Sequence, residues 1–145
     1  MASEQSEFWS TIAPRYDQVV DAQIGPATRS MVRERVAREG PLGRVVEFGC
    51  GTGFFTDVLA GKAERVVATD VAPGMVQLAE RRVQATNVSF QVEDCQRSSF
   101  ADEVLRHGIH QPRPALHRAC PHRPGDASAA ARGGTLLVVN LDPGP

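Results

Sequence analysis

The feature that most constrains this chain is a glycine-rich segment, Glu47-Phe-Gly-Cys-Gly-Thr-Gly53, which joins two segments of different character. Residues 44–48 before it are rich in β-branched side chains and predict a strand, whereas residues 54–60 after it have helical character. Glycines let the backbone turn sharply and approach a ligand closely, and a following helix offers free backbone N–H groups to an electron-rich group. The segment therefore predicts a ligand-binding loop between a strand and a helix.

Strand and helix signals alternate after this loop. Residues 65–70 and 87–92 predict two further strands, and Pro73 is expected to open the helix between them. Residues 133–141 form another strongly strand-like run. This order predicts an α/β fold with a doubly wound, mostly parallel sheet, in which ligands bind at the carboxyl ends of the strands.

Two acidic residues stand at the predicted strand ends. Asp70 ends the second strand 17 residues after Gly53, and Asp94 follows the third strand 24 residues further on. A carboxylate at Asp70 can accept hydrogen bonds from two ribose hydroxyls. Either aspartate alone would be read as a solvated strand end, but their joint spacing with the glycine loop predicts one ligand-binding crevice.

The glycine spacing separates two kinds of nucleotide site. A dinucleotide-binding loop follows G-x-G-x-x-G, whereas this chain has G-x-G-x-G, with Phe54 where the third dinucleotide glycine would stand. Glu47 would add negative charge beside a pyrophosphate and better suits a ligand that carries an ammonium group. A nicotinamide-dependent oxidoreductase is therefore only a second alternative.

As a set, these segments resemble the class I S-adenosylmethionine-dependent methyltransferases. The matching segments are residues 45–56, 67–75 and 87–94, and Phe8-x4-Ala13-x2-Tyr16-Asp17 looks like the N-terminal element of the small-molecule branch. The resemblance covers roughly residues 8–100 and 133–141. It implies a Rossmann-like fold, S-adenosylmethionine as the cofactor, and methyl transfer to an unidentified small-molecule acceptor.

The resemblance also implies roles for single residues. Glu47 would lie near the methionine amino group, usually through water, and Asp70 would hold the ribose hydroxyls. Asp94 would accept a hydrogen bond from the adenine amine, and Tyr16 would cover the cofactor. The other implied cofactor-binding residues are the loop residues Gly49, Cys50, Gly51, Thr52 and Gly53, the adenine-flanking Val71 and Met75, and Cys95, whose backbone lies beside Asp94.

Some of these residues have a second interpretation. Met75 and Tyr16 can equally be packing residues, and Cys50 fits a loop with little room rather than a nucleophile. No residue is identified as a general base, so the catalytic residues stay unknown.

The cysteine content and the net charge limit the cellular compartment and the classes of binding partner that can be expected. The three cysteines, Cys50, Cys95 and Cys120, form no C-x-x-C pair and read as free thiols of a reducing compartment, which predicts a cytoplasmic protein. A formal net charge of −1 and the lack of a long apolar run predict neither nucleic acid nor membrane as a partner. The four histidines between His107 and His122 fit no standard metal-site spacing, so no metal is expected.

The pattern fails between about residues 102 and 132, where proline, arginine and histidine are frequent. We therefore divide the chain into an N-terminal helical segment, 1–40, and a cofactor-binding domain, 41–145, that is irregular at 102–132. The encoded chain lacks an obvious fourth strand, which the resemblance would place beside the glycine-loop strand at the centre of the sheet. A gap is therefore expected there, the sheet is expected to be incomplete in its C-terminal half, and the chain is expected to be truncated. A catalytically inactive cofactor-binding remnant is accordingly the first alternative to an active methyltransferase.

A shifted reading frame at about residues 103–132 would explain the irregular segment. Moving the degenerate codons from Leu105 to Arg118 by one base permits F-D-(T/M)-(V/A)-F, which resembles the fourth strand of the family. The alternative is a genuine, divergent insertion. Sequencing the coding DNA around codons 103–135 is expected to reveal the shift, and one unbroken, error-free frame confirmed in the transcript would contradict it.

Overall fold

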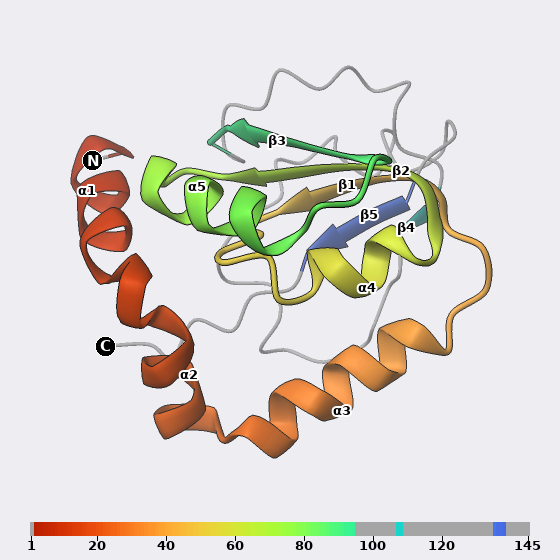
Figure 1. Cartoon of the computed structure of the whole chain (residues 1–145), viewed down its shortest axis with the longest axis horizontal. Helices are drawn as coiled ribbons and strands as arrows, with labels where there is room; N and C mark the ends of the chain where they lie inside the picture. Colours follow the sequence, from red (N-terminus) through yellow and green to blue (C-terminus); the bar gives the residue numbers. More distant parts are fainter. Residues whose placement is uncertain (1, 95–106, 109–134, 139–145) are drawn as a thin grey trace.

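A computed structural model describes residues 2–94, 107–108 and 135–138 (Figure 1). Helices and strands alternate from residue 43 onward, after an entirely helical N-terminal segment. The helices are α1 (Ala2–Ile12), the 3-10 turn η1 (Ala13–Arg15), α2 (Tyr16–Ile24), α3 (Pro26–Ala37), α4 (Thr56–Ala60) and α5 (Pro73–Arg82). The strands are β1 (Gly43–Phe48), β2 (Ala63–Asp70), β3 (Val88–Val92), β4 (His107–Gly108) and β5 (Thr135–Val138).

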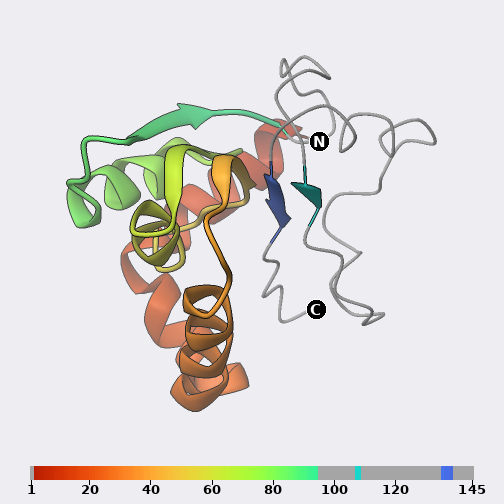
Figure 2. The ribbon, with the colours of Figure 1, turned by 90° about the vertical axis from the view of Figure 1, so that its right-hand side faces the viewer.

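These strands form one parallel sheet in the order β3-β2-β1-β5-β4, with β1 at its centre. Helices α4 and α5 connect β1 to β2 and β2 to β3, and both lie on the same face of the sheet (Figure 2). Parallel strands need such crossover connections, which bring the carboxyl ends of β1, β2 and β3 to one edge. The prediction of an α/β, Rossmann-like fold with a parallel sheet is confirmed.

The prediction of a gap beside the glycine-loop strand, β1, is wrong. β5 occupies that position and pairs with β1 from Val45–Thr135 to Phe48–Val138. β4 then pairs with the other side of β5. Apart from His107 and Gly108, the segment with the expected frame shift lies outside the described residues.

The core lies between β1, β2 and the helices that cover them. Aliphatic side chains from both strands and from α4 and α5 are almost completely buried, which is the burial that stabilises such a layer. They include Val45, Leu59, Val66, Ala68 and Ala79.

Helix α1 docks on α5 through small residues. The backbone N–H of Gly74 donates to Ser10 Oγ at 3.2 Å, and a Cβ atom at Gly74 would lie 3.0 Å from Ser10 Cα. Trp9 and Ile12 pack beside this contact against a buried cluster that contains Met75. The N-terminal helices are thereby attached to the sheet domain next to the glycine loop. In the part of the chain that the structure describes, no helix is long and apolar enough to cross a membrane.

Candidate functional site

The glycine loop between β1 and α4 adopts a backbone that only glycine tolerates easily. Gly49, Gly51 and Gly53 have φ angles of +69°, +54° and +81°. Side chains with a Cβ atom are disfavoured there, which accounts for the G-x-G-x-G spacing. Two backbone hydrogen bonds hold the loop, from Cys50 N to Thr69 O at 2.8 Å and from Gly53 N to Cys50 O at 2.9 Å.

The three glycines face different surroundings. A Cβ atom at Gly53 would lie 3.1 Å from the backbone of Ala79, so this glycine lets α5 approach the loop. At Gly51 it would lie 3.4 Å from Cε1 of Tyr16. At Gly49, which is exposed, it would meet nothing within 4 Å. Gly53 is thus a packing glycine, whereas Gly49 borders open space at the carboxyl edge of the sheet.

Asp70 ties the loop to the end of β2. Its carboxylate accepts hydrogen bonds from Gly51 N and from Ala72 N, both at 2.9 Å, and the residue is 8% exposed. Burial raises the pKa of Asp70, although these backbone N–H groups favour its ionised form. A carboxylate oxygen can accept more than one hydrogen bond, so Asp70 keeps acceptor capacity for a ligand hydroxyl.

The end of β3 lies beside Asp70. The Glu93 N–H donates to the Asp70 carbonyl at 3.0 Å, and Val92 pairs with Asp70 in the sheet. Asp94, half-buried, follows directly. The aspartates predicted at neighbouring strand ends are therefore brought to the same edge, while Cys95 lies outside the described residues.

Glu47 lies beneath the loop, fully buried in β1. Its carboxylate accepts a hydrogen bond from Thr56 Oγ1 at 2.6 Å. Burial raises the pKa of Glu47 to about 7; the Thr56 hydrogen bond opposes this shift, and the negative charge of Asp70 adds to it. Near neutral pH this side chain is thus divided between its protonated and ionised forms.

We expect Glu47→Gln to flatten the pH dependence of stability. The pKa of Glu47 is about 7 in the folded chain, against 4.5 for the free group. The contribution of this residue to the free energy of unfolding is therefore full below pH 4.5 and is lost as the pH rises through 7. The resulting loss is about 2 to 3 kcal/mol between about pH 5 and pH 8, and the variant should lack it. Urea unfolding of both proteins at the two pH values measures the difference, and equal pH slopes would contradict the prediction.

A small pocket opens between the glycine loop and the N-terminal helices. Several residues predicted to bind the cofactor meet there, but four of its lining residues were not predicted. The lining residues are Tyr16, Val20, Arg29, Gly49, Cys50, Gly51, Thr52, Phe54 and Phe55.

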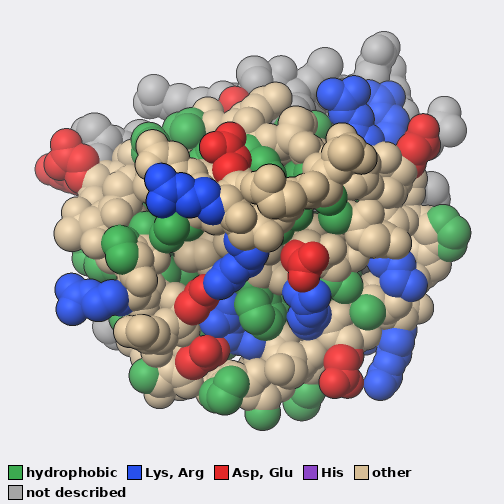
Figure 3. Space-filling model, in the orientation of Figure 1, with side chains coloured by type: hydrophobic (Ala, Val, Ile, Leu, Met, Phe, Trp, Pro, Cys, Tyr) green, Lys and Arg blue, Asp and Glu red, His purple; other side chains and the backbone are tan. Residues whose placement is uncertain are grey.

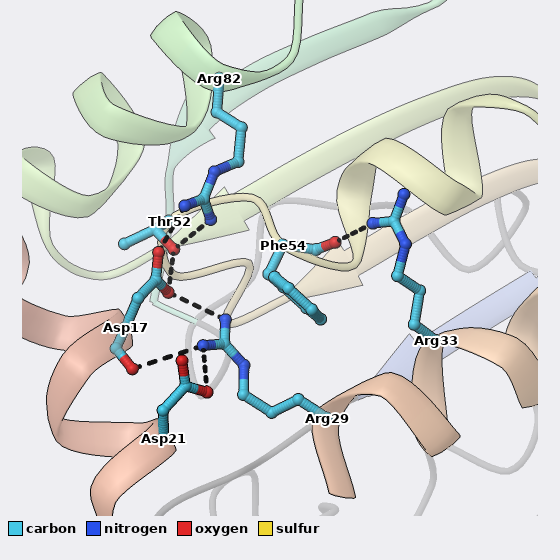
Figure 4. A network of polar contacts seen from close by, with 7 residues as sticks. All are labelled: Asp17, Asp21, Arg29, Arg33, Thr52, Phe54 and Arg82. Atoms are coloured by element: carbon cyan, nitrogen blue, oxygen red, sulfur yellow. Dashed lines mark hydrogen bonds and ion pairs between the residues drawn. The ribbon is translucent and has the colours of Figure 1, made fainter. Parts of the chain in front are cut away.

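Arg29 is the most informative of the residues that the sequence analysis missed. It is 3% exposed, and its guanidinium donates to Asp17 at 2.9 Å and to Asp21 at 3.0 Å (Figure 4). The same group lies 3.9 Å from the ring centre of Phe54, at the end of the glycine loop. An arginine in a helix of mixed charge is normally solvated. The signal that could have identified it is the pair of aspartates four residues apart on the preceding helix.

The structure assigns packing positions to two other candidates. Met75 is 2% exposed and packs with Ala13 and Ala72, which agrees with its alternative interpretation as a core residue. Cys50 is buried, and burial raises the pKa of its thiol well above the ordinary value, so it does not supply a thiolate. Val71 is half-buried next to Asp70.

Charges of both signs are interspersed on the face shown in Figure 3. Among residues 2–94, 107–108 and 135–138, no three histidine, cysteine or acidic side chains gather as metal ligands would. The remaining histidines and Cys120 lie outside this part of the chain.

Comparison with known proteins identifies relatives of one kind. A family model described as a methyltransferase domain matches residues 45–116. The chain is 34% identical over 132 residues to a ubiquinone biosynthesis O-methyltransferase of Xanthomonas campestris pv. campestris. This alignment covers 84% of the present chain and 52% of the relative. It is 32% identical over 89 residues to a malonyl-[acyl-carrier protein] O-methyltransferase of Bacillus cereus, which covers 59% of this chain and 33% of that protein. The matches thus span between a third and about half of these relatives.

Solved structures show the same fold. The DhpI–SAH complex aligns with a TM-score of 0.53 at 31% identity and covers 66% of this chain and 46% of that one. A phosphoethanolamine N-methyltransferase of Haemonchus contortus, in complex with phosphoethanolamine and S-adenosylhomocysteine, aligns with a TM-score of 0.58 at 23% identity, over 70% of this chain and 23% of that one. The glycine loop, β2 and most of β1 fall within the region that the family model matches.

Proposed function

The chain belongs to the class I S-adenosylmethionine-dependent methyltransferases, and from this we propose that it binds S-adenosylmethionine and transfers its methyl group to a small-molecule acceptor. The observation that carries the proposal is the glycine loop, which opens beside Gly49 and is tied by Gly51 to the Asp70 carboxylate. The DhpI complexes with SAH and with SAM and HEP, 31% identical to this chain, support the choice of cofactor.

The residues present fit this cofactor. Gly49 leaves space at the carboxyl ends of the strands, where Rossmann-like sheets bind nucleotides. Asp70 offers acceptor capacity for ribose hydroxyls, and Asp94 on the neighbouring strand end would accept from the adenine amine. Glu47 would interact with the methionine ammonium from beneath the loop, through water. The other proposed cofactor-binding residues are Gly49, Gly51 and Thr52 of the loop together with Tyr16, Val71 and Cys95, whereas Cys50, Gly53 and Met75 take packing positions.

When bound, the cofactor supplies a sulfonium methyl group that is already activated for transfer. The chain's own task is then to orient the cofactor, bring the acceptor atom into line and exclude water. The pocket wall formed by Tyr16, Val20 and Phe55 contributes to that exclusion.

The acceptor is proposed only as a class. The two relatives are named malonyl-[acyl-carrier protein] O-methyltransferase and ubiquinone biosynthesis O-methyltransferase, and both names favour oxygen as the acceptor atom. An inactive cofactor-binding remnant is the second candidate, because no residue of the described site is identified as a general base. We also propose the division into a helical segment, 1–40, and a methyltransferase domain, 41–145, and a cytoplasmic location, which the free thiol of Cys50 supports.

Isothermal titration calorimetry with S-adenosylhomocysteine tests the proposal, with NAD as the control ligand. We expect saturable binding of S-adenosylhomocysteine and none of NAD. A folded sample that binds neither would overturn both candidates. Binding without transfer of a labelled methyl group to any member of a panel of hydroxyl and amine acceptors would favour the remnant.

A further inference from the structure

Asp17 joins three elements that are distant in sequence. It lies near the start of α2, and its Oδ1 atom accepts hydrogen bonds from Arg29 Nη2 of α3 at 2.9 Å and from Thr52 Oγ1 of the glycine loop at 2.8 Å. Its Oδ2 atom accepts from Arg82 Nη2 at the end of α5. Figure 4 shows these side chains converging from the separate elements. One carboxylate therefore connects the N-terminal helices to both the loop and the sheet domain.

Three of these side chains form a closed ring. Arg82 Nη1 donates to Thr52 Oγ1 at 2.8 Å, while Thr52 donates its single hydroxyl proton to Asp17. The ring fixes the Thr52 hydroxyl as both donor and acceptor. Thr52 is 5% exposed and stands between Gly51 and Gly53, whose positive φ angles make the loop shape. Holding Thr52 thus holds the turn between these glycines.

The positively charged arginines around Asp17 stabilise the ionised form of its carboxylate. Burial alone would raise the pKa of Asp17, but the hydrogen bonds from Arg82, Thr52 and Arg29 outweigh it and lower the pKa. Hydrogen bonds that involve charged groups are stronger than neutral ones, and a connected set of them favours one arrangement.

We propose that Asp17 is a positioning residue, which holds Thr52 and the glycine loop in the conformation that receives the cofactor and so makes cofactor affinity depend on the docking of α2. The inference rests on the proposed function, since it names how the same site is shaped. Asp17 acts through Thr52 and needs no contact with the cofactor.

Asp21 provides a matched control on the same helix. Its carboxylate accepts from Nη1 of the same Arg29 at 3.0 Å and links α2 to α3, but within the described residues its side chain bonds neither Thr52 nor Arg82. If the aspartates only attach α2 to α3, then Asp17→Asn and Asp21→Asn should have similar effects. If Asp17 positions the loop, only Asp17→Asn should change the loop and the affinity.

The test combines two measurements on both variants. In the ligand-free proteins, amide hydrogen exchange of residues 50–55 should quicken in Asp17→Asn and stay unchanged in Asp21→Asn. In calorimetry, Asp17→Asn should weaken S-adenosylhomocysteine binding about tenfold and Asp21→Asn less than about twofold. Unchanged loop exchange in Asp17→Asn, or equal effects of the two variants, would overturn the inference. Failure of the wild-type protein to bind would instead overturn the proposed function, and the exchange result still decides the role of Asp17 in the loop.

A second pair of variants covers the case in which Asp17→Asn does not fold. Thr52→Val removes the hydroxyl from the ring, whereas Thr52→Ser keeps it. We expect Thr52→Val to reproduce the faster loop exchange in the ligand-free protein, and Thr52→Ser to keep the exchange of the wild-type loop. Equal behaviour of the two Thr52 variants would overturn the inference.

Discussion

Asp70→Asn is expected to weaken S-adenosylhomocysteine binding by about 100-fold or more and to destabilise the fold. The two Asp70 oxygens accept hydrogen bonds from Gly51 N and Ala72 N, whereas an asparagine side chain has only one acceptor oxygen. Its amide group would then face a backbone N–H, and each buried N–H left unpaired costs about 1–3 kcal/mol. The loss of loop geometry adds to the loss of an acceptor for the ribose, and both act on the same ligand.

Glu64→Gln is the control for this prediction. Glu64 lies on the same strand as Asp70 but is exposed, and the substitution also removes one negative charge. We expect its affinity to stay within about twofold of the wild-type value, because exposed charges contribute little. Calorimetry measures affinity, and thermal unfolding measures stability. An Asp70→Asn protein that binds as tightly as Glu64→Gln would show that the carboxylate does not hold the ligand.

The fold was largely predictable from local patterns. The β-branched runs at 44–48 and 65–70 became β1 and β2, and Pro73 opens α5, because strand content and helix starts depend on nearby residues. The position of β5 was not predictable in this way. Which strand lies beside β1 depends on tertiary pairing, and the expectation of a gap there came from the order of strands in the resembling family rather than from the run at 135–138 itself.

The residues of the candidate site also fall into a group that was predictable from local sequence and a group that was not. The loop glycines and the aspartates at strand ends were found because their roles follow from backbone conformation and spacing along the chain. Arg29 was missed because its burial results from two aspartates on another helix and an aromatic ring on the loop. Contacts between segments that are far apart in sequence produce no local sequence pattern. Without such a pattern, an arginine is expected to be exposed to solvent.

Gly53→Ala and Gly49→Ala should separate the structural glycine of the loop from the one that borders the ligand. Both residues have positive φ, +81° and +69°, so both substitutions incur a backbone cost of about 1–2 kcal/mol. A Cβ at Gly53 would also lie 3.1 Å from the Cα and Cβ atoms of Ala79 in α5, which cannot move without shifting the helix. We therefore expect Gly53→Ala to lose about 3 kcal/mol or more of unfolding free energy in urea.

Gly49→Ala should show the opposite balance. Its Cβ would meet nothing within 4 Å, so the stability loss should stay near the backbone cost alone, about 1–2 kcal/mol. The added methyl group would enter the open space that we assign to the cofactor, and S-adenosylhomocysteine binding should weaken about tenfold or more. If Gly49→Ala binds normally, the cofactor does not approach the loop at this residue. If Gly53→Ala is no less stable than Gly49→Ala, the contact between the loop and α5 does not limit the fold, because the two variants share the same backbone cost and differ only in what the new methyl group meets.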